Sequence, residues 1–80
     1  MKDYLGNEIN IGDIVLFAGR ASKGYTAAFD EMVVTEIKRV NGRDTVQMKR
    51  SYYDEGRLAN NVINLTALGL RPKQNVGEVE

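Results

Sequence analysis

The feature that most constrains the fold is the pair Asn41-Gly42, which stands between two runs rich in β-branched residues, EMVVTEIKRV and RDTVQMKR. Asn and Gly tolerate the positive φ angles that both central positions of a type I′ turn require. Such a turn joins two antiparallel strands through a loop of two residues. The sequence therefore predicts a β-hairpin over residues 31–50.

A two-residue loop also fixes which residues face each other in this hairpin. The predicted pairs run outward from Val40–Arg43 and Arg39–Asp44, and the latter is an expected cross-strand ion pair. Farther on, they are Lys38–Thr45, Ile37–Val46, Glu36–Gln47, Thr35–Met48, Val34–Lys49 and Val33–Arg50. Because side chains alternate along a strand, this register predicts an apolar face and a polar face. The apolar face comprises Val33, Thr35, Ile37, Val46 and Met48, and the polar face comprises Glu36, Lys38, Thr45, Gln47 and Lys49.

The composition limits both the size and the chemistry of the molecule. A chain of 80 residues with 42% apolar and 28% charged residues is typical of one small globular domain. The absence of Cys and His excludes disulfides, the usual zinc ligand sets and a histidine general base. No segment has the apolar length of a signal peptide core or a membrane span. We therefore expect a cytoplasmic protein with no cofactor, no metal and no membrane partner.

The rest of the chain is also dominated by short extended segments and turns. The apolar run at 13–18 predicts a strand that is buried on both sides or lies at a barrel seam. A long loop is expected over 19–31, although residues 25–30 are open to interpretation as loop or as the start of the next strand. Turn signals stand at 54–56, a short strand is expected over 60–65, and 66–70 fits a single helical or 3-10 turn closed by Gly69. Residues 74–80 read as a flexible acidic tail.

This pattern predicts an all-β fold, a small barrel of about five short antiparallel strands. The expected core consists of Val15, Phe17, Val33, Ile37, Val46, Met48 and Ile63.

Gly12-Asp13-Ile14-Val15, followed by Gly19, Lys23-Gly24 and a Val-rich strand that ends at Ile37, resembles the KOW-type module. That module is a small SH3-like β-barrel of ribosomal proteins and transcription elongation factors. Where the module has a Gly soon after Lys-Gly, this chain has the segment 25–29. The resemblance implies a single SH3-like barrel domain over 1–73 and the binding of RNA or DNA. The opening LGNEINIGDIV is also similar to small proteins of tailed bacteriophages, which implies an accessory protein in the host cytoplasm.

One candidate surface for a protein partner contains Tyr52, Tyr53, Arg57 and Tyr25. Tyr and Arg are the residue types most often found as anchors of protein interfaces. The alternative interpretation is that both adjacent tyrosines pack the barrel, with their hydroxyl groups at the surface.

An alternative candidate surface, for nucleic acid, combines aromatic and basic side chains: Arg20, Lys23, Tyr25, Phe29, Lys38, Arg43 and Lys49. Aromatic rings that stack on bases and cations that neutralise phosphates are what single-strand binding requires. Residues 37–73 hold eight basic and three acidic side chains, which indicates a basic face. The formal net charge of zero points the other way, since phosphate neutralisation dominates such affinities.

The adjacent carboxylates Asp30-Glu31 and Asp54-Glu55 are weak candidates for an acid/base dyad or a metal site. Neither pair has a further carboxylate or a phosphate-cradling loop at useful spacing, and adjacent carboxylates in turns are usually solvated. We therefore expect no catalytic residues and no enzymatic activity. The leading prediction is a non-enzymatic protein-interaction module, such as a phage accessory protein that modulates a host protein. The alternatives are a KOW-like RNA/DNA-binding module and a structural or virion component that self-associates through barrel edges.

Overall fold

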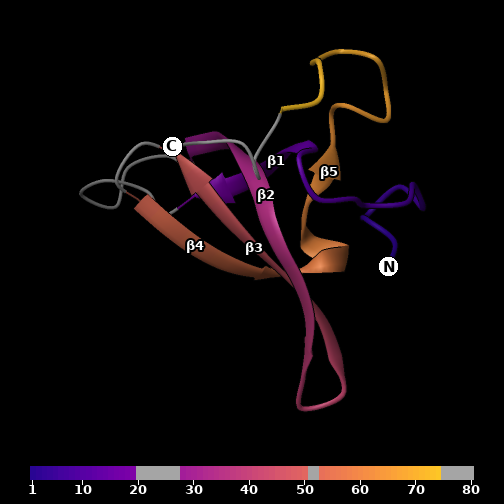
Figure 1. Ribbon diagram of the computed structural model, residues 1–80, viewed down its shortest axis with the longest axis vertical. Coiled ribbons are helices and arrows are strands. Elements are labelled where there is room, and N and C mark those ends of the chain that lie inside the picture. Colours follow the sequence, from indigo (N-terminus) through magenta and orange to yellow (C-terminus); the bar gives the residue numbers. More distant parts are fainter. Residues whose placement is uncertain (20–27, 51–52, 75–80) are drawn as a thin grey trace.

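The computed structural model describes residues 1–19, 28–50 and 53–74, which form one antiparallel sheet of five strands in the order β4-β3-β2-β1-β5 (Figure 1). The strands are β1 (Ile14–Gly19), β2 (Ala28–Val40), β3 (Arg43–Arg50), β4 (Tyr53–Leu58) and β5 (Ile63–Asn64). A 3-10 helix, η2 (Ala59–Asn61), stands between β4 and β5. The predicted all-β class with five strands is confirmed. The predicted loop residues 20–27 and tail residues 75–80 lie outside the described residues.

The predicted Asn-Gly hairpin is confirmed, and it joins β2 to β3. Asn41 and Gly42 both have positive φ angles, 53° and 77°, as a type I′ turn requires. The register agrees with the prediction from Val40–Arg43 as far as Glu36–Gln47. In Figure 1 the tip of this hairpin projects away from the rest of the molecule.

Beyond Glu36 the predicted register is wrong, because β2 contains a bulge at Thr35. The observed partners are Val34–Met48 and Val33–Lys49. The extra residue turns Val34 and Met32 toward the core in place of Val33 and Thr35, so the core receives a valine and a methionine instead of a valine and a threonine. The Thr35 hydroxyl donates a hydrogen bond of 3.2 Å to the carbonyl oxygen of Gln47, which keeps this polar group satisfied outside the core.

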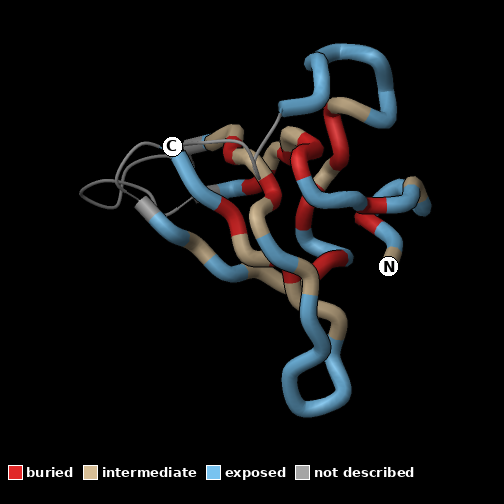
Figure 2. Tube along the Cα trace, viewed as in Figure 1, coloured by how far each residue is buried: buried red, intermediate tan, exposed pale blue. Residues whose placement is uncertain are grey.

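The core lies on one face of the sheet, called here the inner face. It consists of Ile9, Val15, Phe17, Met32, Val34, Val46, Met48, Ala59 and Val62. Figure 2 shows the buried stretches within the body of the molecule, whereas the hairpin tip is exposed. Four predicted core residues are confirmed: Val15, Phe17, Val46 and Met48. Ile37 is partly buried against this core, whereas Val33 and Ile63 point to the other face and are half-buried. The bulge turns Val33 to that face, and Ile63 lies there opposite Leu16. The strand predicted over 60–65 is shorter than expected, because Ala59–Asn61 form η2 and β5 covers Ile63–Asn64.

The sheet is strongly curled, so that its distant strands approach each other. The guanidinium carbon of Arg57 on β4 lies 5.0 Å from the ring centroid of Phe17 on β1, although β2 and β3 separate these strands in the sheet. Arg57 faces Val46, and Phe17 is buried, so both side chains lie on the inner face. The curled sheet therefore encloses the core from both sides.

A buried asparagine joins both ends of the described chain. Asn64 is 0% exposed. Its side-chain nitrogen Nδ2 donates hydrogen bonds to the backbone carbonyl of Glu8 (2.9 Å) and to the carboxylate of Asp13 (2.7 Å). Its side-chain oxygen accepts from the backbone N–H of Ala67, and its own backbone N–H donates to Asp3 Oδ2. These bonds hold the first residues of the chain along the outer edge of β5.

Two local predictions at the end of the chain had different outcomes. The turn predicted at 54–56 is wrong, because these residues lie within β4, where Gly56 faces Gln47. The turn predicted near 66–70 is present: Gly69 has a φ of 80°, and its N–H donates to the carbonyl of Thr66. The 3-10 helix of the described residues, however, is η2 at 59–61. Within residues 1–19, 28–50 and 53–74, no helix is long and apolar enough to cross a membrane.

Candidate functional site

The face of the sheet opposite the core, called here the outer face, carries an apolar patch over β5, β1 and β2. The strand register places Ile14 beside Val33, Leu16 beside Ile63, and Phe29 beside Ala18. We define the outer apolar patch as Ile14, Leu16, Phe29, Val33 and Ile63. The four aliphatic members are half-buried, and Phe29 is 70% exposed. Of the two alternatives predicted for the 13–18 strand, burial on both sides is therefore wrong: its inner side is buried and its outer side is partly open. The other alternative, a barrel seam, stays a prediction.

An ion pair crosses this patch. Arg71 Nε and one terminal nitrogen contact the two carboxylate oxygens of Glu31 at 2.9 and 3.1 Å, in the bidentate geometry that Arg and carboxylates favour. Glu31 lies opposite Leu16 on the outer face, so the Arg71 side chain reaches the patch from the segment after the 65–69 turn. Leu68 within that turn and Leu70 directly after it are exposed. The patch thus combines apolar surface with one fixed pair of opposite charges.

The inner face ends in a group of charged residues next to Phe17. Glu55 and Arg57, two residues apart on β4, form an ion pair of 2.8 Å, and the Arg57 guanidinium lies over the Phe17 ring. Asp30, which faces Phe17 across β1 and β2, contacts Arg50 at 3.5 Å. These groups cover the aromatic end of the core with charges that are paired within the chain.

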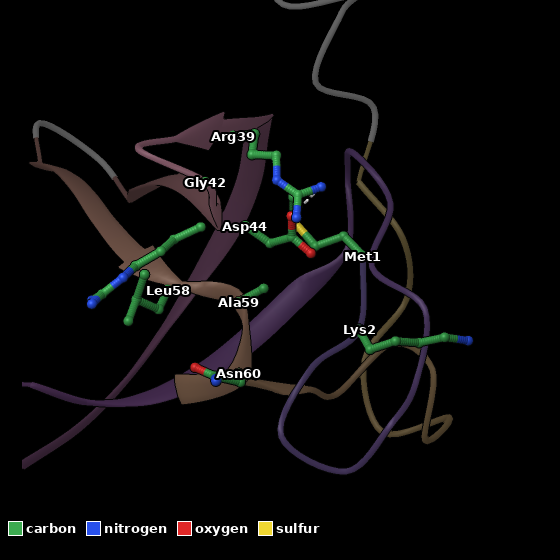
Figure 3. Close-up of a pocket in the computed structure, with 9 residues that line it drawn as sticks. Met1, Lys2, Arg39, Gly42, Asp44, Leu58, Ala59 and Asn60 are labelled. Atoms are coloured by element: carbon green, nitrogen blue, oxygen red, sulfur yellow. Dashed lines mark ion pairs between the residues drawn. The ribbon is translucent and has the colours of Figure 1, made fainter.

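A hollow of about 580 Å³ lies between the hairpin tip, the end of β4, η2 and the first residues of the chain (Figure 3). It is lined by Met1, Lys2, Arg39, Gly42, Arg43, Asp44, Leu58, Ala59 and Asn60. The predicted Arg39–Asp44 ion pair is confirmed at 3.7 Å, and Figure 3 shows it beside the Met1 side chain. Basic side chains outnumber acidic ones in this lining, so the hollow suits an anionic group better than a cationic one.

One titratable group next to this hollow has a shifted pKa. Glu8 accepts a hydrogen bond of 2.8 Å from the amino group of Met1 and contacts the Lys2 ammonium at 3.3 Å. The pKa of Glu8 is lowered below its ordinary value of 4.5. The hydrogen bond from the amino group is the larger cause and the hydrogen bond from Lys2 the second, because both stabilise the charged carboxylate.

This shift makes a pH-dependent prediction. A carboxylate whose pKa is lowered by folding stabilises the folded state above pH 4.5, and this contribution disappears as the pH falls through the folded pKa. Glu8→Gln is therefore expected to lower the urea midpoint slightly at pH 7 and to have a smaller effect at about pH 3, below the ordinary pKa of 4.5. Equal effects of the substitution at both pH values would contradict this assignment.

The predicted protein-binding residues are only partly described. Tyr25 and Tyr52 lie outside the described residues, and Tyr53 is the first residue of β4. The structure places Arg57 on the inner face, where its charge is paired with Glu55 and its plane covers Phe17. Arg57 therefore has a role within the fold. The outer apolar patch was not among the candidate sites, although the unbroken apolar run in β1 was its signal.

The predicted nucleic-acid surface is spread along the outer face. Arg20, Lys23 and Tyr25 lie outside the described residues. Phe29, Lys38, Arg43 and Lys49 are all exposed. Phe29 and Lys38, however, stand near opposite ends of β2, nine residues and roughly 30 Å apart. The structure brings Arg43 together with Arg39 at the hairpin tip and leaves the aromatic ring at the far end.

The adjacent carboxylates do not form a pair that faces one ligand. Asp30 contacts Arg50 on the inner face, and Glu31 contacts Arg71 on the outer face. Asp54 and Glu55 likewise point to opposite faces of β4. Among residues 1–19, 28–50 and 53–74, no three acidic side chains are close enough to hold a metal ion.

Comparisons with known proteins place the chain in a family. The model of a domain of unknown function, DUF7205, matches residues 1–66, which include all five described strands and the hydrogen bonds from Asn64 to Asp3, Glu8 and Asp13. Neither curated proteins nor solved structures gave a match. With more than three quarters of its length matched, the chain belongs to the DUF7205 family.

Proposed function

We propose that this protein is a non-enzymatic protein-interaction module that binds its partner through the outer apolar patch. One observation carries the proposal: a sheet face that is normally polar when it meets water holds four half-buried aliphatic side chains and a phenylalanine that is 70% exposed. The Glu31–Arg71 ion pair beside these side chains offers fixed charges that would orient a bound partner on the patch. Apolar surface with a fixed polar group is the composition of specific protein interfaces.

The proposed architecture is an SH3-like barrel. The sheet order, in which the first strand pairs with the last, and the strong curl that brings Arg57 over Phe17 support it. The similarity of the opening segment to tailed-phage proteins makes a bacterial host protein the proposed partner class, with the host cytoplasm as the compartment.

A photo-crosslinking amino acid placed at Phe29 tests this proposal. Incubated with bacterial lysates and irradiated, this protein is expected to form a covalent adduct with one dominant protein. The matched control carries the same group at Val40, which is exposed on β2 near the hairpin tip, far from the patch. Equal adduct yields at both positions, or no adduct at Phe29 with lysates of several hosts, would contradict the proposal.

The hairpin tip favours a second candidate function, the binding of nucleic acid. The tip projects from the body of the molecule (Figure 1). Lys38, Arg39 and Arg43 are exposed there, and Arg39 and Arg43 line the hollow that suits an anionic group. A two-stranded β-ribbon fits the major groove of DNA.

Fluorescence anisotropy with a labelled duplex, measured across a salt series, tests this second function. Arg43→Glu is expected to weaken binding at least tenfold and to flatten the salt dependence by about one phosphate contact. Lys49→Glu changes a cation farther along β3 and is expected to have the smaller effect. A salt-independent signal, or equal effects of the two substitutions, would exclude the hairpin tip as the binding element.

A further inference from the structure

The two edges of the sheet differ in whether described residues cover them. The β5 edge is covered by the first residues of the chain: the N–H of Tyr4 donates to the carbonyl of Val62, and Asp3 accepts from the N–H of Asn64. At the other end of the sheet, β4 pairs with β3 on one side, and no described strand follows it on the other. An open strand edge offers a row of backbone donors and acceptors to another strand.

The inner side of this edge is charged in a way that selects its partner. Glu55 and Arg57 both point to the inner face, where an added apolar strand would leave them next to uncharged side chains. Inward-pointing charges of this kind normally discourage strand addition. A strand that presents an arginine opposite Glu55 and a carboxylate opposite Arg57 removes this obstacle, because opposite charges on facing strands attract.

The β4 sequence itself is such a strand. Two copies related by a two-fold axis form an antiparallel pair in which one residue lies opposite itself. When that residue is Gly56, Glu55 of each copy faces Arg57 of the other, and the four charges alternate in sign. When it is Asp54, Glu55 or Arg57, a like charge lies opposite itself. Charge therefore selects the register centred on Gly56.

Gly56 also leaves space at the two-fold axis, where the two copies of this residue would lie opposite each other. It has no side chain, and its φ angle is compatible with any residue. An added Cβ there would meet only the side chain of Gln47, at 3.2 Å from its flexible amide oxygen.

We propose that the protein forms a symmetric dimer by antiparallel pairing of β4 with β4 of a second copy, centred on Gly56. The paired edges join two curled sheets into one continuous sheet. Since β4 does not contribute to the outer apolar patch, dimerisation leaves that patch accessible. The proposed dimer and the proposed binding of a partner through the patch can therefore be tested independently.

Oxidative crosslinking tests the axis directly, because the chain has no native cysteine. Opposed residues of an antiparallel pair have Cα atoms about 5 Å apart, within the reach of a disulfide. Gly56→Cys is expected to give a covalent dimer on a non-reducing gel after mild oxidation. In the control, Asp54→Cys, the two thiols are four residues out of register and roughly 13 Å apart, so it stays monomeric. A monomeric Gly56→Cys protein, or equal crosslinking of both variants, would overturn the proposal.

Charge reversal gives a second test, with light scattering and sedimentation as readouts. The native protein is expected at twice its chain mass of 8.9 kDa. Glu55→Arg and Arg57→Glu each place like charges opposite one another, and each is expected to raise the dimer dissociation constant at least tenfold. An equimolar mixture of the two variants restores both opposite-charge pairs and is expected to recover the dimer.

Glu36→Arg makes the same charge change at an exposed position two strands from the edge and should leave the dimer unchanged. A native protein that is monomeric at high concentration would refute the inference. So would a mixture of folded variants that stays monomeric. If a charge reversal unfolds the chain, the crosslinking comparison decides alone.

Discussion

Asn64→Leu is expected to lower the free energy of unfolding by about 3–5 kcal/mol, which is a large share of the stability of a domain this small. Leucine fills a similar volume but makes none of the three side-chain hydrogen bonds. The carbonyl of Glu8 and the carboxylate of Asp13 then lose a donor, and the N–H of Ala67 loses an acceptor. Each buried polar group left without a partner costs about 1–3 kcal/mol.

Equilibrium urea unfolding monitored by circular dichroism measures this effect. The matched control is Asn61→Leu, the same substitution at an exposed position in η2, which should change the stability by less than about 0.5 kcal/mol. Coincident unfolding curves for Asn64→Leu and the native protein would mean that the side-chain hydrogen bonds of Asn64 do not stabilise the fold.

Val34→Asp is expected to unfold the domain, whereas Val33→Asp is expected to leave it folded with a loss of about 1 kcal/mol. Val34 is 0% exposed and points into the core, so a carboxylate there has no partner and no access to water. Val33 is half-buried on the outer face, where a carboxylate remains hydrated.

The two adjacent substitutions together test the bulge at Thr35, since an unbulged hairpin exchanges their positions. Thermal unfolding of the two proteins, recorded side by side, is sufficient. If Val33→Asp unfolds and Val34→Asp melts like the native protein, the continuous register is correct and the bulge is not.

The parts of the fold that could be predicted are those governed by neighbouring residues. Asn41-Gly42 set the turn and the first five residue pairs of the hairpin, because only the local φ angles decide that geometry. The bulge at Thr35 could not be predicted in the same way. It depends on whether Met32 and Val34 fill the core better than Val33 and Thr35, and this is decided by strands far away in the sequence.

The Asn64 hydrogen bonds were missed for a related reason. Asp3, Asp13 and Asn64 are residue types that ordinarily stay near turns in water, and nothing local indicates that they meet in the interior. Gly56 was misread as part of a turn because Asp-Glu-Gly favours one, whereas pairing with β3 keeps it extended.

The long sequence separation of the Asn64 hydrogen bonds also predicts the order in which the chain folds. The bond from Asn64 to Asp3 joins residues 61 positions apart, and that to Asp13 joins residues 51 apart, whereas the β2–β3 hairpin closes across two residues. Closing a long loop costs more chain entropy and is slow, so these bonds form after the hairpin. During synthesis, the first residues of the chain cannot form their native contacts with Asn64 until Asn64 has left the ribosome. Loss of this side chain should therefore accelerate unfolding and leave the folding rate nearly unchanged.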